Sequence, residues 1–277
     1  MLYSVKDILD LGEKGGFAIP AFNVYNLEEV IGVMKAAEET GAPVIFQLFN
    51  RLAESTSIGR FLSPAILEAI KALKTPAAFH LDHGSTESNV LRAIRYGTTG
   101  VMIDASTYDY EENVKRTKRI VDIAKEVGVA VEGELGHVGS TKDEKIGEYT
   151  QTDEAVRFVE ETGVDALAIM VGTAHGHYKK APVLAIDRIK EIHSKTKAHL
   201  VLHGGSGVPD DQIKMAIDAG IRKINFATDV NCTYLKGFRK IDCDTMPLDV
   251  MLSYPTNDVK DFAIEKIKLL GADKYNG

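Results

Sequence analysis

The sequence predicts an α/β protein, specifically a closed (β/α)8 barrel. Short apolar runs alternate with amphipathic segments along the chain, and eight such units lie before residue 230. Apolar strands separated by helices are typical of a parallel sheet covered on both faces, and eight units fit a barrel of about 250 residues. An open doubly wound sheet is the alternative, but no GxGxxG motif follows the first apolar run.

The expected strands are runs rich in β-branched and other apolar residues. They cover residues 16–22, 43–48, 77–82, 100–104, 129–135, 166–172, 199–203 and 222–227. The intervening segments, such as 27–39 and 110–127, have helical periodicity. Glycines that favour helix ends precede several of these runs: Gly41, Gly100, Gly128, Gly163 and Gly220.

The chain shows no Pro/Ser-rich linker and no break in composition, so we expect one domain over residues 1–277. A helical tail is expected from about residue 240, with a last helix near residues 258–270. Nothing in the sequence indicates a second folding unit after the eighth strand.

Charge and cysteine content exclude several classes of protein. The 33 Lys and Arg residues against 40 Asp and Glu give a net charge of -7, which disfavours binding to nucleic acid or anionic membranes. No apolar run reaches the length of a membrane span, and no signal peptide is recognisable at the N-terminus. Two cysteines, Cys232 and Cys243, cannot form a disulfide scaffold. We therefore expect a cytoplasmic protein.

Histidines gather where the predicted strands end, which is where barrels place their active sites. Six of the eight lie at such ends: His80, His83, His137, His175, His177 and His203. Three imidazoles with one open position is a catalytic zinc arrangement, so the pattern predicts a metal site. Taken singly, a buried histidine is most often a hydrogen-bonded core residue; the convergence of three from different strands favours the metal site.

A glycine-rich stretch predicts a phosphate site after strands seven and eight. The sequence LHGGSG at 202–207 precedes a helix, and INFATD at 224–229 ends the eighth strand. Loops after strands seven and eight bind phosphate in many barrels through backbone N–H groups and a helix terminus. The alternative is an ordinary glycine-rich turn.

Taken together, these motifs resemble the class II, metal-dependent ketose-bisphosphate aldolases of the fructose and tagatose type. The resemblance covers about residues 1–240 and follows the family order, namely HLDHG at 80–84, VEGELGHVG at 131–139, GTAHGHY at 172–178, LHGGSG and KINFATD. It implies a barrel lyase of carbohydrate metabolism, such as glycolysis, that forms a homodimer or homotetramer. Its substrate would be a small phosphorylated sugar, a ketose 1,6-bisphosphate or related ketose 1-phosphate. The products would be dihydroxyacetone phosphate and an aldehyde.

The resemblance also implies roles for individual residues. The zinc ligands would be His83, His175 and His203, and Asp82 would give and take a proton. Asp104 and Glu134 would hold a second or alternative metal position. The dihydroxyacetone-phosphate half would be bound by Gly176, Gly204, Gly205, Ser206, Asn225, Ala227 and Thr228. A monovalent cation would lie near the loops after strands six and seven.

These residue types suit the implied chemistry. Cleavage of a carbon–carbon bond beside a hydroxyl leaves an enediolate, whose charge Zn²⁺ stabilises as a Lewis acid, so no lysine Schiff base is needed. Asp82 adjoins His83, and neighbouring residues in a strand point to opposite faces, so its reach depends on the local turn. Its alternative role is to orient a ligand histidine.

Two stretches depart from the family pattern. After strand two, Phe49 stands about where the family has a serine, and Asn50 and Arg51 follow it as candidate substrate-binding residues. Arg51 suits a carboxylate, phosphate or sulfonate, which predicts a different acidic aldehyde; an alternative packing of the loop is equally open. After Glu134, the loop carboxylates Asp143 and Glu144 are displaced from the family position.

Two other functions remain possible on the sequence. An isomerase on the same phosphate-binding barrel would not need the third histidine. A non-catalytic relative would have no reason to keep Asp82 beside a complete set of ligand histidines.

Overall fold

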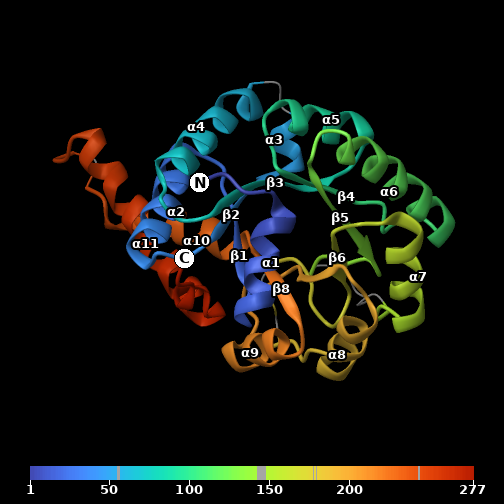
Figure 1. The fold of residues 1–277 in the computed structure, drawn as a ribbon. Helices are drawn as coiled ribbons and strands as arrows, with labels where there is room; N and C mark the ends of the chain where they lie inside the picture. Colours follow the sequence, from blue (N-terminus) through green and yellow to red (C-terminus); the bar gives the residue numbers. More distant parts are fainter. Residues whose placement is uncertain (55–56, 142–147, 177, 179, 243) are drawn as a thin grey trace.

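The computed structural model describes residues 1–54, 57–141, 148–176, 178, 180–242 and 244–277. Its strands form one closed parallel barrel in chain order, with the last strand paired to the first (Figure 1). This confirms the predicted (β/α)8 fold. The strands are β1 Ile19–Asn23, β2 Val44–Phe49, β3 Ala77–Gly84, β4 Gly100–Ile103, β5 Ala130–Leu135, β6 Ala166–Ile169, β7 His199–Leu202 and β8 Ile221–Phe226.

Helices surround the barrel and alternate with its strands (Figure 1). The α-helices are α1 Val5–Gly15, α2 Leu27–Thr40, α3 Asn50–Glu54, α4 Ile58–Ala72, α5 Glu87–Arg95, α6 Tyr110–Lys125, α7 Thr152–Thr162, α8 Ile186–Lys195, α9 Asp210–Asp218, α10 Thr228–Gly237 and α11 Leu248–Leu270. Two short 3₁₀ helices are η1 Phe238–Lys240 and η2 Ala272–Lys274. No helix in the described ranges is long and apolar enough to cross a lipid bilayer.

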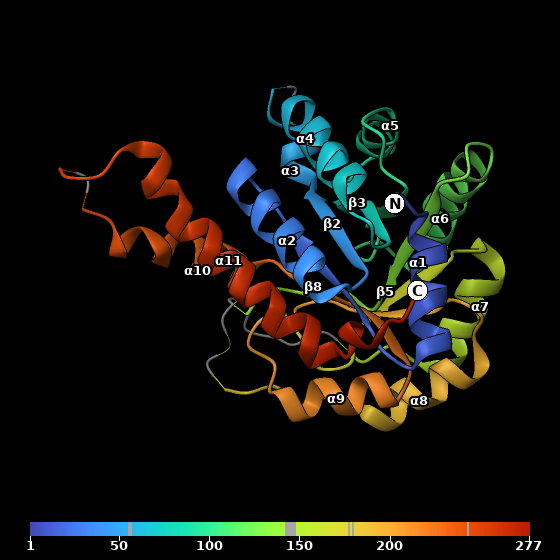
Figure 2. The same cartoon turned by 60° about the vertical axis from the view of Figure 1, so that its left-hand side comes forward.

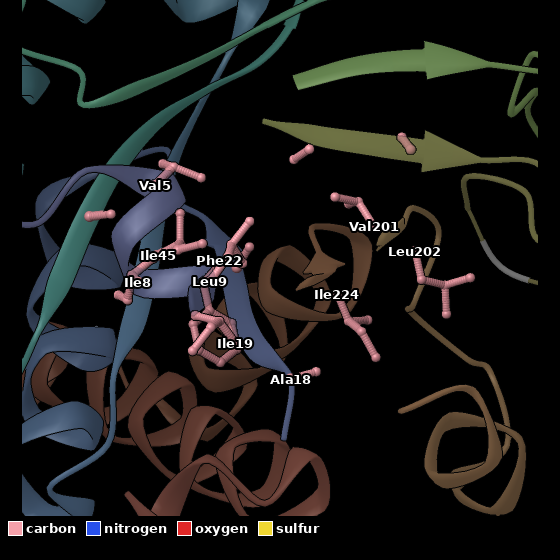
Figure 3. Close-up of a cluster of buried hydrophobic side chains, with 14 of the residues drawn as sticks. Val5, Ile8, Leu9, Ala18, Ile19, Phe22, Ile45, Val201, Leu202 and Ile224 are labelled. Atoms are coloured by element: carbon pink, nitrogen blue, oxygen red, sulfur yellow. The ribbon is translucent and has the colours of Figure 1, made fainter. Parts of the chain in front are cut away.

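Helix α1 covers the barrel end at which the strands begin. Val5, Ile8 and Leu9 are buried and belong to the same hydrophobic core as the strand residues (Figure 3). Polar contacts hold α1 to the first residues of β7 and β8. His199 Nε2 lies 2.8 Å from Asp10 Oδ1, and Arg222 Nε donates to Glu13 Oε2 at 2.7 Å. Since this end is closed, any binding site in the barrel must open at the carboxyl ends of the strands.

Two boundaries differ from the sequence prediction. Strand β1 begins at Ile19 rather than residue 16, because α1 continues to Gly15 and Gly16 ends it with a left-handed φ of 67°. Helix α11 begins at Leu248, ten residues before the predicted start, and runs through Pro255. The later part of α11 packs along α2, whereas its first part extends with α10 beyond the side of the barrel (Figure 2).

Candidate metal and substrate site

The end of β3 is irregular, and this irregularity brings two neighbouring side chains to one cavity. The pairing of β3 with β4 shifts between Leu81 and Gly84, and His83 has a φ of 53°, the one left-handed non-glycine residue in the described chain. Such a conformation is costly for a residue with a Cβ and is typical of functional sites. Asp82 and His83 therefore line the same cavity instead of pointing to opposite faces.

Three histidines from β3, the loop after β6 and the end of β7 converge at the open end. The ring centroid of His83 lies 4.9 Å from that of His175 and 4.7 Å from that of His203. The centroids of His175 and His203 are 5.7 Å apart. One ring nitrogen from each lies within 4.8 Å of the others. This spacing is compatible with three ligands to one small cation.

Hydrogen bonds to the outer ring nitrogens leave the other nitrogens free to bind a metal. Nε2 of His203 lies 2.8 Å from Glu132 Oε1, and Nδ1 of His175 lies 3.0 Å from the carbonyl oxygen of Val138. Nδ1 of His83 lies 2.8 Å from Asp104 Oδ2. Metal-binding histidines commonly donate their second nitrogen in this way, which fixes the ring orientation.

Two buried polar atoms at the centre of the cluster have no hydrogen-bond partner in the described structure. They are Nδ1 of His203 and Oε2 of Glu134, which lie 3.2 Å apart. Burial alone would lower the pKa of His203, but the neighbouring carboxylates of Glu132 and Glu134 raise that pKa to about 10. An imidazole nitrogen and a carboxylate oxygen that lie close together in a buried site without a hydrogen bond fit a bound cation, and the three-histidine set fits Zn²⁺.

A second group of possible ligands overlaps the first. Oxygen atoms of Asp104 and Glu134 lie within 4.8 Å of each other and of a ring nitrogen of His83. Burial opposes the ionised form of both carboxyl groups, yet the hydrogen bond to His83 lowers the pKa of Asp104 and contacts with His137 and His203 hold that of Glu134 well below its usual range. The ionised pair fits a second or alternative metal position.

Asp82 is held by side-chain amides from three other strands. Its carboxylate accepts hydrogen bonds from Asn23 at 2.7 Å, Asn225 at 3.1 Å and Gln47 at 3.4 Å. Burial would raise the pKa of Asp82, but the charges of His83 and His203 and the bond from Asn23 lower it. The carboxylate is thus ionised and fixed beside the histidine cluster, as a proton acceptor needs to be.

A small polar cavity lies next to Asp82 at the ends of β6, β7 and β8. It is lined by Asn23, Asp82, His175, Gly176, Gly204, Ser206, Asn225, Ala227 and Thr228. Gly204 has a φ of 65°, and a Cβ there would lie 2.4 Å from the Ala174 carbonyl oxygen. The Tyr178 hydroxyl braces this turn, because it accepts from Ala174 N at 2.8 Å and donates to Gly204 O at 2.9 Å. Only glycine fits this turn, because a Cβ would collide with the backbone of the loop after β6.

A wider cavity opens from the histidine cluster toward α3. Its lining includes Tyr25, Phe49, Arg51, Thr228 and Asn231, and Arg51 is the one lysine or arginine among the described residues that line either cavity. The Arg51 guanidinium carbon lies 5.0 Å from the Phe49 ring centroid, and that ring lies 6.3 Å from the ring of His83. The positive charge of Arg51 makes this part of the wider cavity suited to an anionic group.

Asn50 faces away from both cavities. It is buried, donates to Glu54 Oε1 at 2.9 Å, and accepts from Ser85 N and Asn89 Nδ2. The structure thus separates it from Arg51, although the two are neighbours in sequence. The candidate loop carboxylates Asp143 and Glu144, and His177, lie outside the described residues.

Several residues at the site were missed in the sequence analysis. Asn23 and Gln47 hold Asp82, Glu132 and Lys223 lie under the histidines, and Tyr25 lines the mouth. A signal for some of them was present, since Gln47, Glu132 and Lys223 are polar residues inside predicted strands.

The chain is similar to known proteins in sequence and in structure over nearly its whole length. Residues 3–274 match the family model described as fructose-bisphosphate aldolase class-II. A sulfofructosephosphate aldolase of Alkalicoccus urumqiensis is 36% identical over 96% of this chain and 93% of its own length. A 6-phospho-5-dehydro-2-deoxy-D-gluconate aldolase of Halalkalibacterium halodurans is 40% identical over 82% of this chain and 81% of its own.

The crystal structure of the YdjI aldolase from Escherichia coli K12 superimposes with a TM-score of 0.90 and 35% identity, covering all of both chains. The family match, the relatives and this structure agree over nearly the whole length. The chain therefore belongs to the class II fructose-bisphosphate aldolase family and is an aldolase, a carbon–carbon lyase.

Proposed function

We propose that the protein is a zinc-dependent aldolase that reversibly cleaves a ketose 1-phosphate to dihydroxyacetone phosphate and an aldehyde. The observation that carries the proposal is the convergence of His83, His175 and His203 around the unpartnered Nδ1 of His203. Asp82 and a glycine-lined polar cavity adjoin this cluster. Metal, base and phosphate site would thus act on adjacent atoms of one substrate.

The chain's own residues would share the work as follows. Bound Zn²⁺ supplies Lewis-acid stabilisation of the negative charge that develops on the substrate oxygens. In the cleavage direction, Asp82 takes the proton from the C4 hydroxyl, since its carboxylate is ionised and borders both cavities. Backbone groups at Gly204 and Gly176 and the side chains of Ser206 and Asn225 would bind the phosphate half. A monovalent cation near the loops after β6 and β7 would add to that binding.

The aldehyde half would carry an anionic group that Arg51 binds. A planar guanidinium recognises carboxylate, phosphate and sulfonate groups alike. The names of two relatives support this range of acidic groups. One is named for sulfofructosephosphate and the other for a phosphorylated deoxygluconate, at 36% and 40% identity to this chain. The substrate is therefore a ketose 1,6-bisphosphate or a ketose 1-phosphate with another acidic end.

Metal analysis and a substrate panel test the proposal. Purified protein should contain about one zinc per catalytic site, and a chelator should abolish cleavage reversibly. Borohydride added with substrate should trap no lysine adduct, because no Schiff base forms. Cleavage that survives complete metal removal would contradict the proposal. Fructose and tagatose bisphosphates should be compared with sulfonated and carboxylated ketose 1-phosphates.

We also propose that the enzyme is cytoplasmic and forms a homodimer or homotetramer. The low cysteine content supports the first part, and the helices α10 and α11 that extend from the barrel expose Leu235, Leu248 and Val250. Light scattering on the purified protein measures the assembly; a strictly monomeric enzyme would contradict the second part.

A further inference from the structure

A buried ion pair lies inside the barrel beneath the histidine cluster. The Lys223 ammonium donates to Glu132 Oε2 at 2.8 Å, and the other carboxylate oxygen of Glu132 lies 2.8 Å from Nε2 of His203. His80 approaches the same carboxylate, with Nε2 at 3.7 Å from Oε2. The side chains of all four residues are fully buried. Glu132 is therefore the shared partner of groups from β3, β7 and β8.

Such a pair is hard to explain by stability alone. Removing two charges from water costs several kcal/mol per ion, and well-packed apolar residues of similar volume are often neutral or stabilising replacements. The core of the described chain is mostly apolar, and Glu132 and Lys223 are among its few buried charged residues. The pair coincides with the one histidine of the cluster whose outer ring nitrogen meets a fully buried carboxylate, since the Asp104 carboxylate beside His83 is 18% exposed.

His203 and His175 are held differently, and the difference points to a role. Nδ1 of His175 meets a neutral backbone carbonyl, that of Val138, whereas Nε2 of His203 meets the charged Glu132. A carboxylate acceptor fixes the tautomer and increases the basicity of the opposite nitrogen more than a carbonyl does. In His203 that opposite nitrogen is Nδ1, which has no hydrogen-bond partner and belongs to the histidine cluster.

We propose that Glu132 and Lys223 are positioning residues that hold His203 with Nδ1 toward His83 and His175, and that this ion pair sets the affinity of the site for its metal. Lys223 balances the charge of Glu132, so that the carboxylate remains a strong acceptor in an apolar surrounding. The inference rests on the zinc site of the proposed function. It adds residues that touch neither metal nor substrate.

Zinc affinity and apo-protein stability together test this inference. The variants are Glu132→Gln, Lys223→Met and the double variant, with Glu13→Gln as control because Glu13 pairs with Arg222 at the closed end of the barrel. Competition with a chromogenic chelator gives the zinc dissociation constant. Thermal melting of the zinc-free protein gives the stability. Neither measurement depends on turnover.

Each single variant should weaken zinc binding by about 10–100-fold and lower the melting temperature, because one buried charge loses its partner. The double variant leaves no unpaired charge, so its melting temperature should recover while its zinc affinity stays weak. The control should bind zinc as the wild type does. If Glu132→Gln does not fold, the zinc affinity of the double variant tests the inference.

Two results would overturn the inference alone. One is wild-type zinc affinity in folded Glu132→Gln, and the other is full recovery of zinc affinity in the double variant, which would reduce the pair to a structural role. Wild-type protein that binds no zinc would overturn the proposed function and this inference with it.

Discussion

The two sides of the barrel mouth are built in different ways. On the side of β3, β7 and β8, Asp82 is 3% exposed and held by amides from three strands, and His203 is 0% exposed and held by Glu132. On the side of β2, Arg51 is exposed, belongs to the five-residue helix α3, and has the Phe49 ring as its neighbour. The reacting groups are thus fixed by buried bonds, while the candidate specificity residue is not.

This difference indicates how members of one family can differ in substrate. A buried network tolerates few substitutions, because each group left without a partner costs about 1–3 kcal/mol. A residue on a short exposed helix can change without that cost. We therefore expect substitutions on the β3 side to abolish chemistry and substitutions on the β2 side to change substrate choice.

His203→Ala should have the largest effect. It removes one of three imidazoles and leaves Glu132 and Glu134 without a shared partner, so zinc content and cleavage should both fall to background. Zinc analysis and an aldol-cleavage assay measure this. His199→Ala is the control, since His199 contacts Asp10 at the closed end and should leave both quantities unchanged. Zinc retention with normal activity in His203→Ala would remove this residue from the proposed site.

Asp82→Asn should have the next largest effect. The amide keeps the shape of the carboxylate but cannot accept a proton, so kcat should fall by roughly 10²–10⁴ while zinc remains bound. Asp10→Asn provides a control far from the open end. A near wild-type kcat would reduce Asp82 to a structural role, and loss of zinc would instead make it a residue that orients His83.

The eight strands were predictable because each is a short apolar run. The end of helix α1 was not predicted, since the first strand was expected to begin at Gly16, three residues before its observed start at Ile19. The start of α11 was missed because Pro255 suggests a break; packing against α2 and the bond from Thr256 Oγ1 to Leu252 O accompany an unbroken helix. Tertiary packing thus accompanies a helix that local preference disfavours at α11, whereas α1 ends at a local glycine signal that the predicted strand overran.

Site residues that belong to one sequence motif could be predicted from the sequence. Contacts between residues of distant strands could not. The three histidines come from motifs at predicted strand ends, but the approach of Asn23, Gln47 and Asn225 to Asp82 depends on barrel closure. Strand periodicity also could not predict that Asp82 and His83 share a cavity, because a register shift and a left-handed residue cause this.

Arg51→Ala should have a smaller effect and one of a different kind. Loss of a contact to the substrate's acidic end should raise KM about tenfold to two-hundredfold, with less change in kcat, because the contact is made equally in ground and transition states. Phe49 in place of a serine also removes a donor, so fructose 1,6-bisphosphate should be cleaved less efficiently than by relatives with that serine.

Steady-state kinetics on the preferred substrate and on fructose 1,6-bisphosphate measure this, and Arg51→Lys is the matched variant. Lysine keeps the charge but loses the planar fork, so KM should recover in part. A silent Arg51→Ala together with ordinary fructose-1,6-bisphosphate kinetics would show that the β2 side is repacked and has no role in specificity.

Glu29→Gln should have the smallest effect on catalysis and a measurable effect on stability. Glu29 is buried on α2 and accepts from the backbone N–H of Tyr25, which lines the wider cavity. Burial raises the pKa of Glu29 from 4.5 to about 7. Between these two values the folded protein keeps a proton that the unfolded chain releases, so the contribution of Glu29 to stability is greatest below 4.5 and is lost as pH rises through 7.

The glutamine variant cannot titrate but can still accept from Tyr25. Urea unfolding at several pH values from 5 to 8 should therefore show that the wild type loses up to about 1.4 kcal/mol per pH unit more than the variant, mostly below pH 7. Glu38→Gln, a change on the same helix at an exposed position, should leave the wild-type slope intact. Parallel curves for wild type and Glu29→Gln would show that Glu29 is ionised in the folded protein throughout this range.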